Sequence, residues 1–357
     1  MEPLDFGHIV IDAAPAGTHN DICLIGDLTG NGREDIVVGG KYGTGNLVWY
    51  DNPGWERHTI ATAHLEAGGV LLDITGNGVP DVVAGNPQDY EEGQSNTRLY
   101  WFESPRDPRG PWTKHLITDA FRKYHDQAIG DVDGDGQVEI VFASQGAKVV
   151  AYFDIPEDPT DCPWPEECCH LIAEDLEVEG LWVGDLDGDG ENEVVAGPNV
   201  FKRTAEGWGR TELVSDLDPR TCVAVGDLTG DGRPDVVLSE GERDRGRLVW
   251  LRAPDWEPVE LTGDLFHPHS LALADFNADG KLDIFVGEMG LGGYESPREI
   301  IYRNAGGGEF EMNVIGNLPT HMATVGDLTG NGLPDIAGKP YDSGKDQVDV
   351  WINHTGR

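Results

Sequence analysis

The stretch Asp131-Val-Asp133-Gly-Asp135-Gly-Gln-Val-Glu139, followed directly by Ile-Val-Phe-Ala, decides the fold of this chain. Acidic side chains stand at its first, third, fifth and ninth places, so their oxygens can surround one hard cation such as calcium. Glycines at the fourth and sixth places permit the positive φ angles of a tight loop. The apolar run behind the loop predicts a buried strand.

The same pattern occurs seven times along the chain. The copies begin at Asp27, Asp73, Asp131, Asp185, Asp227, Asp275 and Asp327. Successive first aspartates lie 42 to 58 residues apart, a spacing that fits a four-stranded propeller blade and exceeds most helical repeats. We therefore predict an all-β, seven-bladed β-propeller that occupies residues 1–357 as a single domain.

Each copy is followed by an aromatic segment and a turn, which predict the third and fourth strands of a blade. The last blade lacks a fourth strand, and Phe6-Gly-His8-Ile-Val-Ile near the N-terminus has the matching pattern. We expect the N-terminal strand to complete the last blade and close the ring, which removes exposed sheet edges. The longest departures from the repeat, at about 86–112 and 154–170, are expected to be surface insertions on one face.

The charge of the chain limits its partners. The sequence contains 65 acidic and 25 basic side chains, which give a formal net charge of −40. This balance excludes a general affinity for nucleic acid or for anionic membranes. No apolar run is long enough to span a bilayer, so membrane insertion is not expected. The sequence does not indicate an oligomeric state.

Only eight of the basic residues are lysine. A surface this acidic and this poor in lysine resembles that of proteins from salt-accumulating halophiles, where concentrated salt screens the self-repulsion. The favoured expectation is a cytoplasmic protein of such an organism, because the N-terminus has no basic or apolar signal region. The alternative is a secreted, calcium-rich protein whose signal has been removed.

Five cysteines are too few for a dense disulfide framework. Cys23 and Cys222 lie in equivalent apolar runs before two acidic loops and are expected to be small buried thiols. Cys162, Cys168 and Cys169 cluster in a proline-rich segment, where they can bind zinc or form one disulfide. Their spacing is not a usual zinc pattern, so a disulfide that staples a surface loop is favoured.

The acidic loops and the strands between them resemble FG-GAP or VCBS repeats, the propellers of integrin α chains and of many microbial proteins. Two stretches narrow the resemblance: His269-Ser-Leu-Ala-Leu-Ala-Asp275 with Phe285-Val-Gly-Glu288-Met289-Gly, and His321 through Gly338-Lys339-Pro340-Tyr341. They are similar to the last two blades of microbial sugar-processing members, such as the aldos-2-ulose (anhydrofructose) dehydratase propeller and propeller polysaccharide lyases. The resemblance implies a carbohydrate substrate or ligand.

The seven loops are candidate calcium sites that differ in their carboxylates. Two loops offer four each: Asp131, Asp133, Asp135 and Glu139, and Asp185, Asp187, Asp189 and Glu193. A third offers Asp275, Asn277, Asp279 and Asp283. In the remaining four loops the candidate ligands are Asp27, Asn31 and Asp35, then Asp73, Asn77 and Asp81, then Asp227, Asp231 and Asp235, and finally Asp327, Asn331 and Asp335.

Two interpretations of these loops remain open. The side chains can hold structural Ca²⁺ at the rim of each blade, or they can hydrogen-bond the amides of their own turns. Four uncompensated carboxylates would repel one another, so the two richest loops favour the metal. The loops with Thr and Asn fit both interpretations equally. An EF-hand is excluded because Val38 and Phe142 stand where it requires glutamate.

The histidines sort by their place in the repeat. Four recur in fourth strands, which argues for a structural or solvent-facing role: His8, His58, His115 and His170. Six lie six to nine residues before a first aspartate, where the innermost strand begins and faces the central channel: His19, His64, His125, His267, His269 and His321. One register is shared by His125, His269 and His321, and is filled in two other blades by Asp21 and Glu179.

This cluster at the channel mouth is the candidate active site. Its residue types suit proton abstraction beside a carbonyl followed by β-elimination, the reaction of a sugar dehydratase or polysaccharide lyase. The candidate catalytic residues are His125, His269, His321, Tyr124, Lys123, His64, His267, Lys339 and Tyr341. The candidate substrate-binding residues are His19, Glu179, Arg220, Glu288 and Arg122.

In this hypothesis, His125 or His269 removes the proton. Tyr124 or Tyr341 protonates the leaving oxygen, and Lys123 or Lys339 holds the substrate. The channel histidines can instead hold Zn²⁺ or Mg²⁺, or simply hydrogen-bond neighbouring blades. The main alternative is a non-catalytic carbohydrate- or protein-binding propeller, a lectin or adhesion module, and a scaffold is a third reading. The sequence contains no nucleophile elbow, phosphate loop or nucleotide fingerprint.

Overall fold

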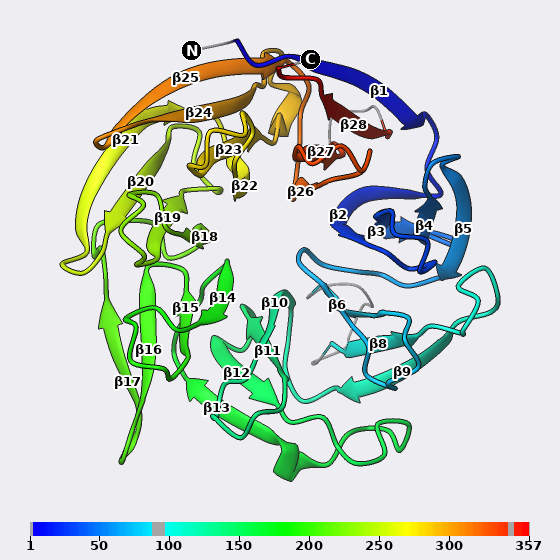
Figure 1. Cartoon of the computed structure of the whole chain (residues 1–357). Coiled ribbons are helices and arrows are strands. Elements are labelled where there is room, and N and C mark those ends of the chain that lie inside the picture. Colours follow the sequence, from blue (N-terminus) through cyan, green and yellow to red (C-terminus); the bar gives the residue numbers. More distant parts are fainter. Residues whose placement is uncertain (1–2, 88–96, 342–345, 357) are drawn as a thin grey trace.

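In the computed structural model, seven four-stranded antiparallel sheets are arranged as blades around one axis (Figure 1). The structure describes residues 3–87, 97–341 and 346–356. The predicted all-β, seven-bladed propeller is confirmed. Helix in the described residues is limited to two short 3-10 turns, η1 (Glu166–Cys168) and η2 (Leu291–Gly293). None of the helices described is long and apolar enough to cross a membrane.

The first four blades use consecutive strands, from the axis outward. Blade 1 contains β2 (Gly17–Gly26), β3 (Asp35–Gly43), β4 (Leu47–Asp51) and β5 (Glu56–Ala61). Blade 2 contains β6 (Val70–Leu72), β7 (Asp81–Gly85), β8 (Leu99–Glu103) and β9 (Thr113–Thr118). Blade 3 contains β10 (Tyr124–Gly130), β11 (Glu139–Ser144), β12 (Val149–Phe153) and β13 (Cys169–Ala173). Blade 4 contains β14 (Leu181–Gly184), β15 (Glu193–Ala196), β16 (Asn199–Thr204) and β17 (Gly207–Glu212).

The last three blades complete the ring. Blade 5 contains β18 (Cys222–Gly226), β19 (Asp235–Ser239), β20 (Gly246–Arg252) and β21 (Glu257–Leu265). Blade 6 contains β22 (Pro268–Ala274), β23 (Asp283–Glu288), β24 (Glu299–Gly306) and β25 (Glu309–Gly316). Blade 7 contains β26 (Thr324–Gly326), β27 (Asp335–Gly338), β28 (Val348–Asn353) and β1 (Phe6–Asp12).

The N-terminal strand closes the ring as predicted. β1 pairs antiparallel with β28, with Phe6 opposite Asn353, and the two chain ends lie side by side (Figure 1). Every strand of blade 7 therefore has the same neighbours as its counterparts in the other blades. Closure leaves no edge of an incomplete blade open to another chain.

The hydrophobic core lies between the blades. The second strands are buried along most of their length, as the continuous apolar runs predict. The third strands contribute fully buried tryptophans: Trp49, Trp101, Trp250 and Trp351. In four fourth strands a histidine lies against an aromatic ring of the third strand, as His115 does on Trp101 with ring centroids 4.3 Å apart. These histidines have the structural role expected from their recurrence.

One part of the predicted organisation is wrong. The segment 86–112 is not a single insertion on one face, because β8 (Leu99–Glu103) lies inside it and separates two connections. In an antiparallel sheet the chain reverses direction after each strand, so successive connections lie at opposite ends of the strands. Residues 88–96 of this segment lie outside the described residues. The segment 154–170 is the connection from β12 to β13 and contains η1.

The predicted disulfide is also wrong. Cys162, Cys168 and Cys169 are free thiols, partly buried against the hydrophobic cluster shared by blades 2 and 3. Their sulfur atoms fill apolar space beside Trp164 and Phe153 in place of a covalent bond.

Candidate active site

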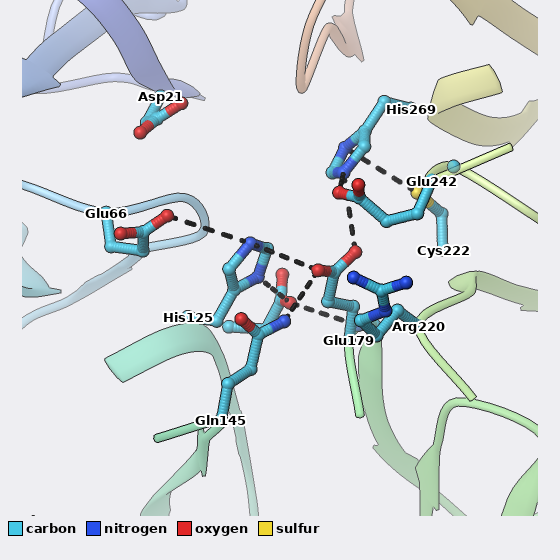
Figure 2. A network of polar contacts seen from close by, with 12 residues as sticks. Asp21, Glu66, His125, Gln145, Glu179, Arg220, Cys222, Glu242 and His269 are labelled. Carbon is cyan, nitrogen blue, oxygen red and sulfur yellow. Dashed lines mark hydrogen bonds and ion pairs between the residues drawn. The ribbon is translucent and has the colours of Figure 1, made fainter. Parts of the chain in front are cut away.

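Seven equivalent backbone positions lie around the propeller axis, each near the start of the first strand of its blade. Each lies six residues before the first aspartate of its acidic loop, and they are Asp21, Ala67, His125, Glu179, Thr221, His269 and His321. Two further carboxylates reach the same space (Figure 2): Glu66, next to Ala67 in the sequence, and Glu242, in the connection between β19 and β20. We call the charged and imidazole side chains of this cluster the polar ring: Asp21, Glu66, His125, Glu179, Glu242, His269 and His321.

His125 is surrounded by carboxylates from three blades (Figure 2). Its Nδ1 lies 2.7 Å from Asp126 Oδ2, on the same strand, β10. Its Nε2 lies 3.5 Å from Glu179 Oε1 and 4.0 Å from Glu66 Oε1. Burial alone would lower the pKa of this imidazole, but attraction to Glu179 and Asp126 outweighs burial and raises it to about 9. With these neighbours, His125 is an imidazolium at neutral pH.

Glu179 joins His125 to His269. Its Oε1 accepts a hydrogen bond from Gln145 Nε2 at 2.5 Å. Its Oε2 lies 3.4 Å from His269 Nε2, and Glu242 Oε1 lies 3.3 Å from the same nitrogen. Glu179, Glu242 and His269 each offer one ligand atom within 4.8 Å of the others. One nitrogen and two carboxylate oxygens suit Zn²⁺ and related metals better than Mg²⁺, which prefers an all-oxygen shell.

The backbone before β14 holds Glu179 in place. Gly180 has a φ of 69°, and its N–H donates to Asp126 Oδ2 at 3.0 Å. Glu179 also forms an isolated parallel bridge with Arg220. The Arg220 guanidinium lies 3.2 Å from Asp218, so this predicted substrate-binding residue is already paired with a carboxylate of its own loop.

His321 continues the polar ring toward blade 1. Its ring centroid lies 4.5 Å from that of His269 and 4.9 Å from that of Tyr341. Its Nδ1 lies 3.4 Å from Asp21 Oδ1. Burial, reinforced by the positive charges of His269 and Lys339, holds the pKa of His321 well below its usual range. The cluster therefore contains a neutral imidazole beside protonated ones.

Lys41 closes the cluster between blades 1 and 2. Its Nζ lies 3.1 Å from Asp21 Oδ2 and 3.1 Å from Glu66 Oε1. The same ammonium donates to Tyr341 Oη at 3.1 Å. Its charge is thus shared by two buried carboxylates, and the phenol of Tyr341 is held beside the histidines.

Lys339 is fully buried in blade 7. Its Nζ donates to the backbone carbonyls of Asn20 and His321, both at 2.5 Å. Burial lowers the pKa of this ammonium to about 8. Because its hydrogen bonds go to backbone, Lys339 ties blade 7 to blade 1 and positions His321.

A cavity of about 210 Å³ adjoins the polar ring. Its walls include Asp126, Glu179, Cys222 and His269, together with glycines and apolar residues of the first strands. Cys222 Sγ lies 4.0 Å from His269 Nδ1, opposite the nitrogen that faces the carboxylates. The space is small beside the roughly 300–1,000 Å³ of drug-sized ligand pockets.

Tyr124 does not reach this cavity. It is fully buried among the apolar side chains of blades 2 and 3, and its Oη accepts a hydrogen bond from the Phe121 N–H. Successive side chains of a strand point to opposite faces. Tyr124 therefore points into the hydrophobic core between blades 2 and 3, whereas His125 points toward the propeller axis. Its predicted role as proton donor is therefore not supported by its position.

Other predicted site residues are engaged elsewhere. Glu288 is buried and forms a two-point ion pair with Arg298, so it stabilises blade 6. His267 contacts Asp244 through Nε2 at 2.9 Å. The remaining predicted site residues also have local contacts. Arg122 donates to Gly146 O, and His64 Nδ1 contacts Lys41 O. His19 packs against Tyr341, and the backbone N–H of Lys123 donates to Thr97 Oγ1.

Two members of the polar ring were missed from the sequence. Glu66 stands seven residues before its first aspartate, beside the register position that Ala67 occupies. Glu242 belongs to the connection between β19 and β20. At the shared register position, blade 2 has Ala67 and blade 5 has Thr221, and neither can ionise. An acidic residue elsewhere in those two blades was the one signal in the sequence that could have pointed to Glu66 or Glu242.

The acidic loops share one hydrogen-bond pattern. The first aspartate accepts from the N–H of the glycine five residues later, as Asp131 does from Gly136 at 3.1 Å. The last acid reaches back to the start of the loop, as Glu139 does to Val132 N at 2.6 Å. In the loops with Thr and Asn, bonds of this kind are the contacts that the turn interpretation expects.

Two loops have a different arrangement. Among the described residues, two sets of loop carboxylates lie close enough together to hold a metal ion: Asp131, Asp133 and Glu139 in blade 3, and Asp185, Asp187 and Glu193 in blade 4. Asp135 and Asp189, at the fifth places, are not part of these groups. Both groups contain glutamate at the ninth place, whose longer side chain reaches into the loop.

Comparison with known proteins agrees with this architecture. A profile of the FG-GAP-like repeat matches residues 27–84 and 227–286, in blades 1–2 and 5–6. These two segments therefore contain FG-GAP-like repeats. The chain is 28% identical over 130 residues to the aldos-2-ulose dehydratase of Phanerodontia chrysosporium. The match covers 32% of the chain and 14% of that protein, so the chain spans a small part of its length.

Solved structures share the propeller fold of this chain. BBS1N, crystallised in complex with ARL6DN, matches with a TM-score of 0.56 and 11% identity over 98% of this chain and 96% of its own. The V. cholerae biofilm matrix protein Bap1 matches with a TM-score of 0.52 and 12% identity, over 99% and 88% respectively. At such identities the likeness concerns the fold alone.

Proposed function

We propose that the polar ring is the active site of a carbohydrate lyase or dehydratase that works by β-elimination. The observation that carries the proposal is the meeting of His125, His269 and His321 with Glu179 in the polar ring, where Glu179 and His269 line one small cavity. The cluster combines neutral and protonated imidazoles with a metal-binding group. The similarity to an aldos-2-ulose dehydratase supports a keto-sugar, or a uronate-containing glycan, as the substrate class.

The proposed reaction needs two proton transfers. A base removes a proton from the carbon next to a carbonyl group, and the electron pair forms a double bond to the following carbon. The carbon–oxygen bond at that second carbon breaks, and its oxygen takes a proton and leaves as water or as an alcohol. Positioned acids and bases contribute about 10²–10⁴-fold to such steps.

The charges of the cluster suggest which residue performs each transfer. We assign the base to His321, because its lowered pKa keeps it neutral and Asp21, 3.4 Å from its Nδ1, can stabilise the imidazolium that forms. His125, whose pKa is raised, suits the donor of a proton to the leaving oxygen. These assignments replace the sequence-based hypothesis in which His125 or His269 is the base.

Glu179, Glu242 and His269 fit a divalent metal such as Zn²⁺. Glu179 Oε2 is buried and faces His269 Nε2 at 3.4 Å without a closer hydrogen bond in the described residues, so a cation held between these two atoms would satisfy the oxygen. His269 would bind through Nε2 as a neutral imidazole, which makes loading pH-dependent. A bound metal would supply a Lewis acid for the substrate carbonyl.

The test is a screen of the purified full chain against neutral keto-sugars and uronate oligosaccharides, with the ultraviolet absorbance of the unsaturated product as readout. Substituting His125→Gln and His321→Gln should each lower kcat/KM at least 100-fold. His58→Gln, at a histidine stacked on Trp49 away from the polar ring, is the control. Full activity in both ring variants would refute the assignment.

A non-catalytic carbohydrate-binding propeller is the second candidate. The observation that favours it is the burial of the polar ring, since His125, His269 and His321 are at most 5% exposed. A sugar that binds with defined stoichiometry and is recovered unchanged would establish binding in place of turnover.

A further inference from the structure

The acidic loops of blades 3 and 4 have the same carboxylates but face opposite charges. Phe153 and Phe201 occupy equivalent positions in the third strands, each opposite the residue that follows the loop glutamate. The next residue of the third strand is Asp154 in blade 3 and Lys202 in blade 4. One blade therefore adds a negative charge beside its loop where the other adds a positive charge.

Lys202 reaches into the blade 4 loop. Its Nζ lies 2.5 Å from Asp187 Oδ2, 2.6 Å from Asp189 Oδ2 and 3.3 Å from Glu193 Oε1. Glu193 is only 1% exposed, and within the described residues its Oε1 has no polar contact besides the one with Lys202. The ammonium, carried by a different strand, β16, thus contacts two of the three carboxylates that form the metal-binding group of this loop.

The blade 3 loop has no such ammonium in the described structure. Arg203 approaches it, but its guanidinium donates to the backbone carbonyl of Asp133 and not to a carboxylate. Asp154 pairs with His170 at 2.9 Å and so turns toward β13. Within the described residues, the group formed by Asp131, Asp133 and Glu139 has no ion pair with a lysine or an arginine, so its negative charge stays uncompensated.

We propose that Lys202 is a tethered cation that takes the place of Ca²⁺ in the blade 4 loop, so that Ca²⁺ binds the blade 3 loop and is excluded from blade 4. The inference is independent of the reaction proposed for the polar ring. It assigns to Lys202 the role of deciding which of two nearly identical loops is a metal site.

Charge and tethering explain the exclusion. An ammonium and a Ca²⁺ ion a few ångströms apart repel each other. Calcium must therefore expel Lys202 before it binds. A side chain fixed to β16 is always present at high effective concentration, whereas the ion must come from solution. In blade 3 the guanidinium of Arg203 is held at the backbone carbonyl of Asp133, so no side-chain cation of the described residues has to leave the three carboxylates before the ion binds.

The test counts calcium sites by isothermal titration calorimetry on the full chain after treatment with EDTA. Lys202→Met should raise the Ca²⁺ stoichiometry by one equivalent, because it removes the internal cation and leaves the four carboxylates. Asp154→Lys should lower it by one equivalent, because it places an ammonium beside the blade 3 loop. Lys148→Met, which removes an exposed lysine paired with Glu177, should leave the number unchanged.

A Ca²⁺ stoichiometry that is the same in the wild type and in Lys202→Met would overturn the proposal. A second measurement does not depend on the folding of any variant. Crystals of the wild type soaked in Ca²⁺ should show an anomalous peak among Asp131, Asp133 and Glu139, and none at the position of Lys202 Nζ. A peak within the 185–193 loop, with Lys202 displaced, would refute the exclusion.

Discussion

The carboxylate of Glu179, in blade 4, lies 3.4 Å from His269 Nε2, in blade 6. The contact joins two blades that are not neighbours, since blade 5 lies between them in the ring. The contact is possible because blade 5 has the short side chain of Thr221 at the equivalent position. A longer residue there would stand between the two groups. The polar ring is therefore asymmetric, with its closest contacts gathered around Glu179.

We expect Glu179→Gln to weaken metal binding at the site proposed for Glu179, Glu242 and His269. The amide keeps the shape of the side chain but removes the negative charge that draws a cation to Glu242 and His269. We expect Zn²⁺ affinity, measured by competition with a chromophoric chelator, to fall at least tenfold. Glu177→Gln, at a neighbouring exposed carboxylate, is the matched control. Equal affinities in the two variants would contradict the assignment of Glu179 as a ligand.

Gly68 is required for the position of His125. It has a φ of 94°, and a Cβ there would lie 2.5 Å from His125 O and 2.8 Å from Asp126 Cα. Gly307 also has a positive φ, 67°, but a Cβ there would meet nothing within 4 Å. Both Gly→Ala changes carry a left-handed backbone cost of about 1–2 kcal/mol.

We expect Gly68→Ala to destabilise the protein more than Gly307→Ala, because only the first displaces backbone beside the polar ring. Urea unfolding of both variants measures the difference, and turnover or sugar binding should fall in Gly68→Ala alone. A variant pair with equal midpoints and equal activity would show that the close approach is unimportant.

Glu299 should make the stability of the protein decrease with rising pH. Its carboxyl is fully buried, and burial raises its pKa from 4.5 to about 8. Between those two values the folded state binds a proton that the unfolded state has lost, so the free energy of unfolding falls as pH rises. Glu299→Gln removes this dependence because the amide has no proton to lose.

We expect Glu299→Gln to equal the wild type near pH 4 and to exceed it by roughly 2–4 kcal/mol at pH 8. Denaturant unfolding at a series of pH values provides the comparison. A parallel pH profile in the two proteins would mean that Glu299 is ionised in the folded state.

Asn304 is a contact between blades 5 and 6. Its Nδ2 donates to Leu228 O in blade 5 at 2.7 Å, and the residue is 1% exposed. Asn304→Ala leaves this buried carbonyl with one partner fewer, which should lower the free energy of unfolding by about 1–3 kcal/mol. Asn313→Ala, whose amide donates within its own strand, should change it by less than about 0.5 kcal/mol.

The blades could be predicted because their signals are local. An acidic loop such as 131–139, a buried strand and an aromatic strand follow one another within each repeat, and backbone geometry turns that order into a sheet. The shared register of His125, His269 and His321 likewise follows from the repeat, since equivalent positions of equivalent strands point to one axis. Tyr124 was misplaced by the same reasoning because its neighbour His125 takes the face toward the axis.

The sequence by itself determined the number of blades, the closure by the N-terminal strand and the ring of polar side chains at one end of the axis. Only the tertiary structure decided which of those side chains meet. Glu66, Glu179, Glu242 and His269 come from four blades, and their contacts depend on side-chain lengths across the ring. The protonation states follow from these contacts, because burial and neighbouring charge fix whether an imidazole such as His321 is neutral.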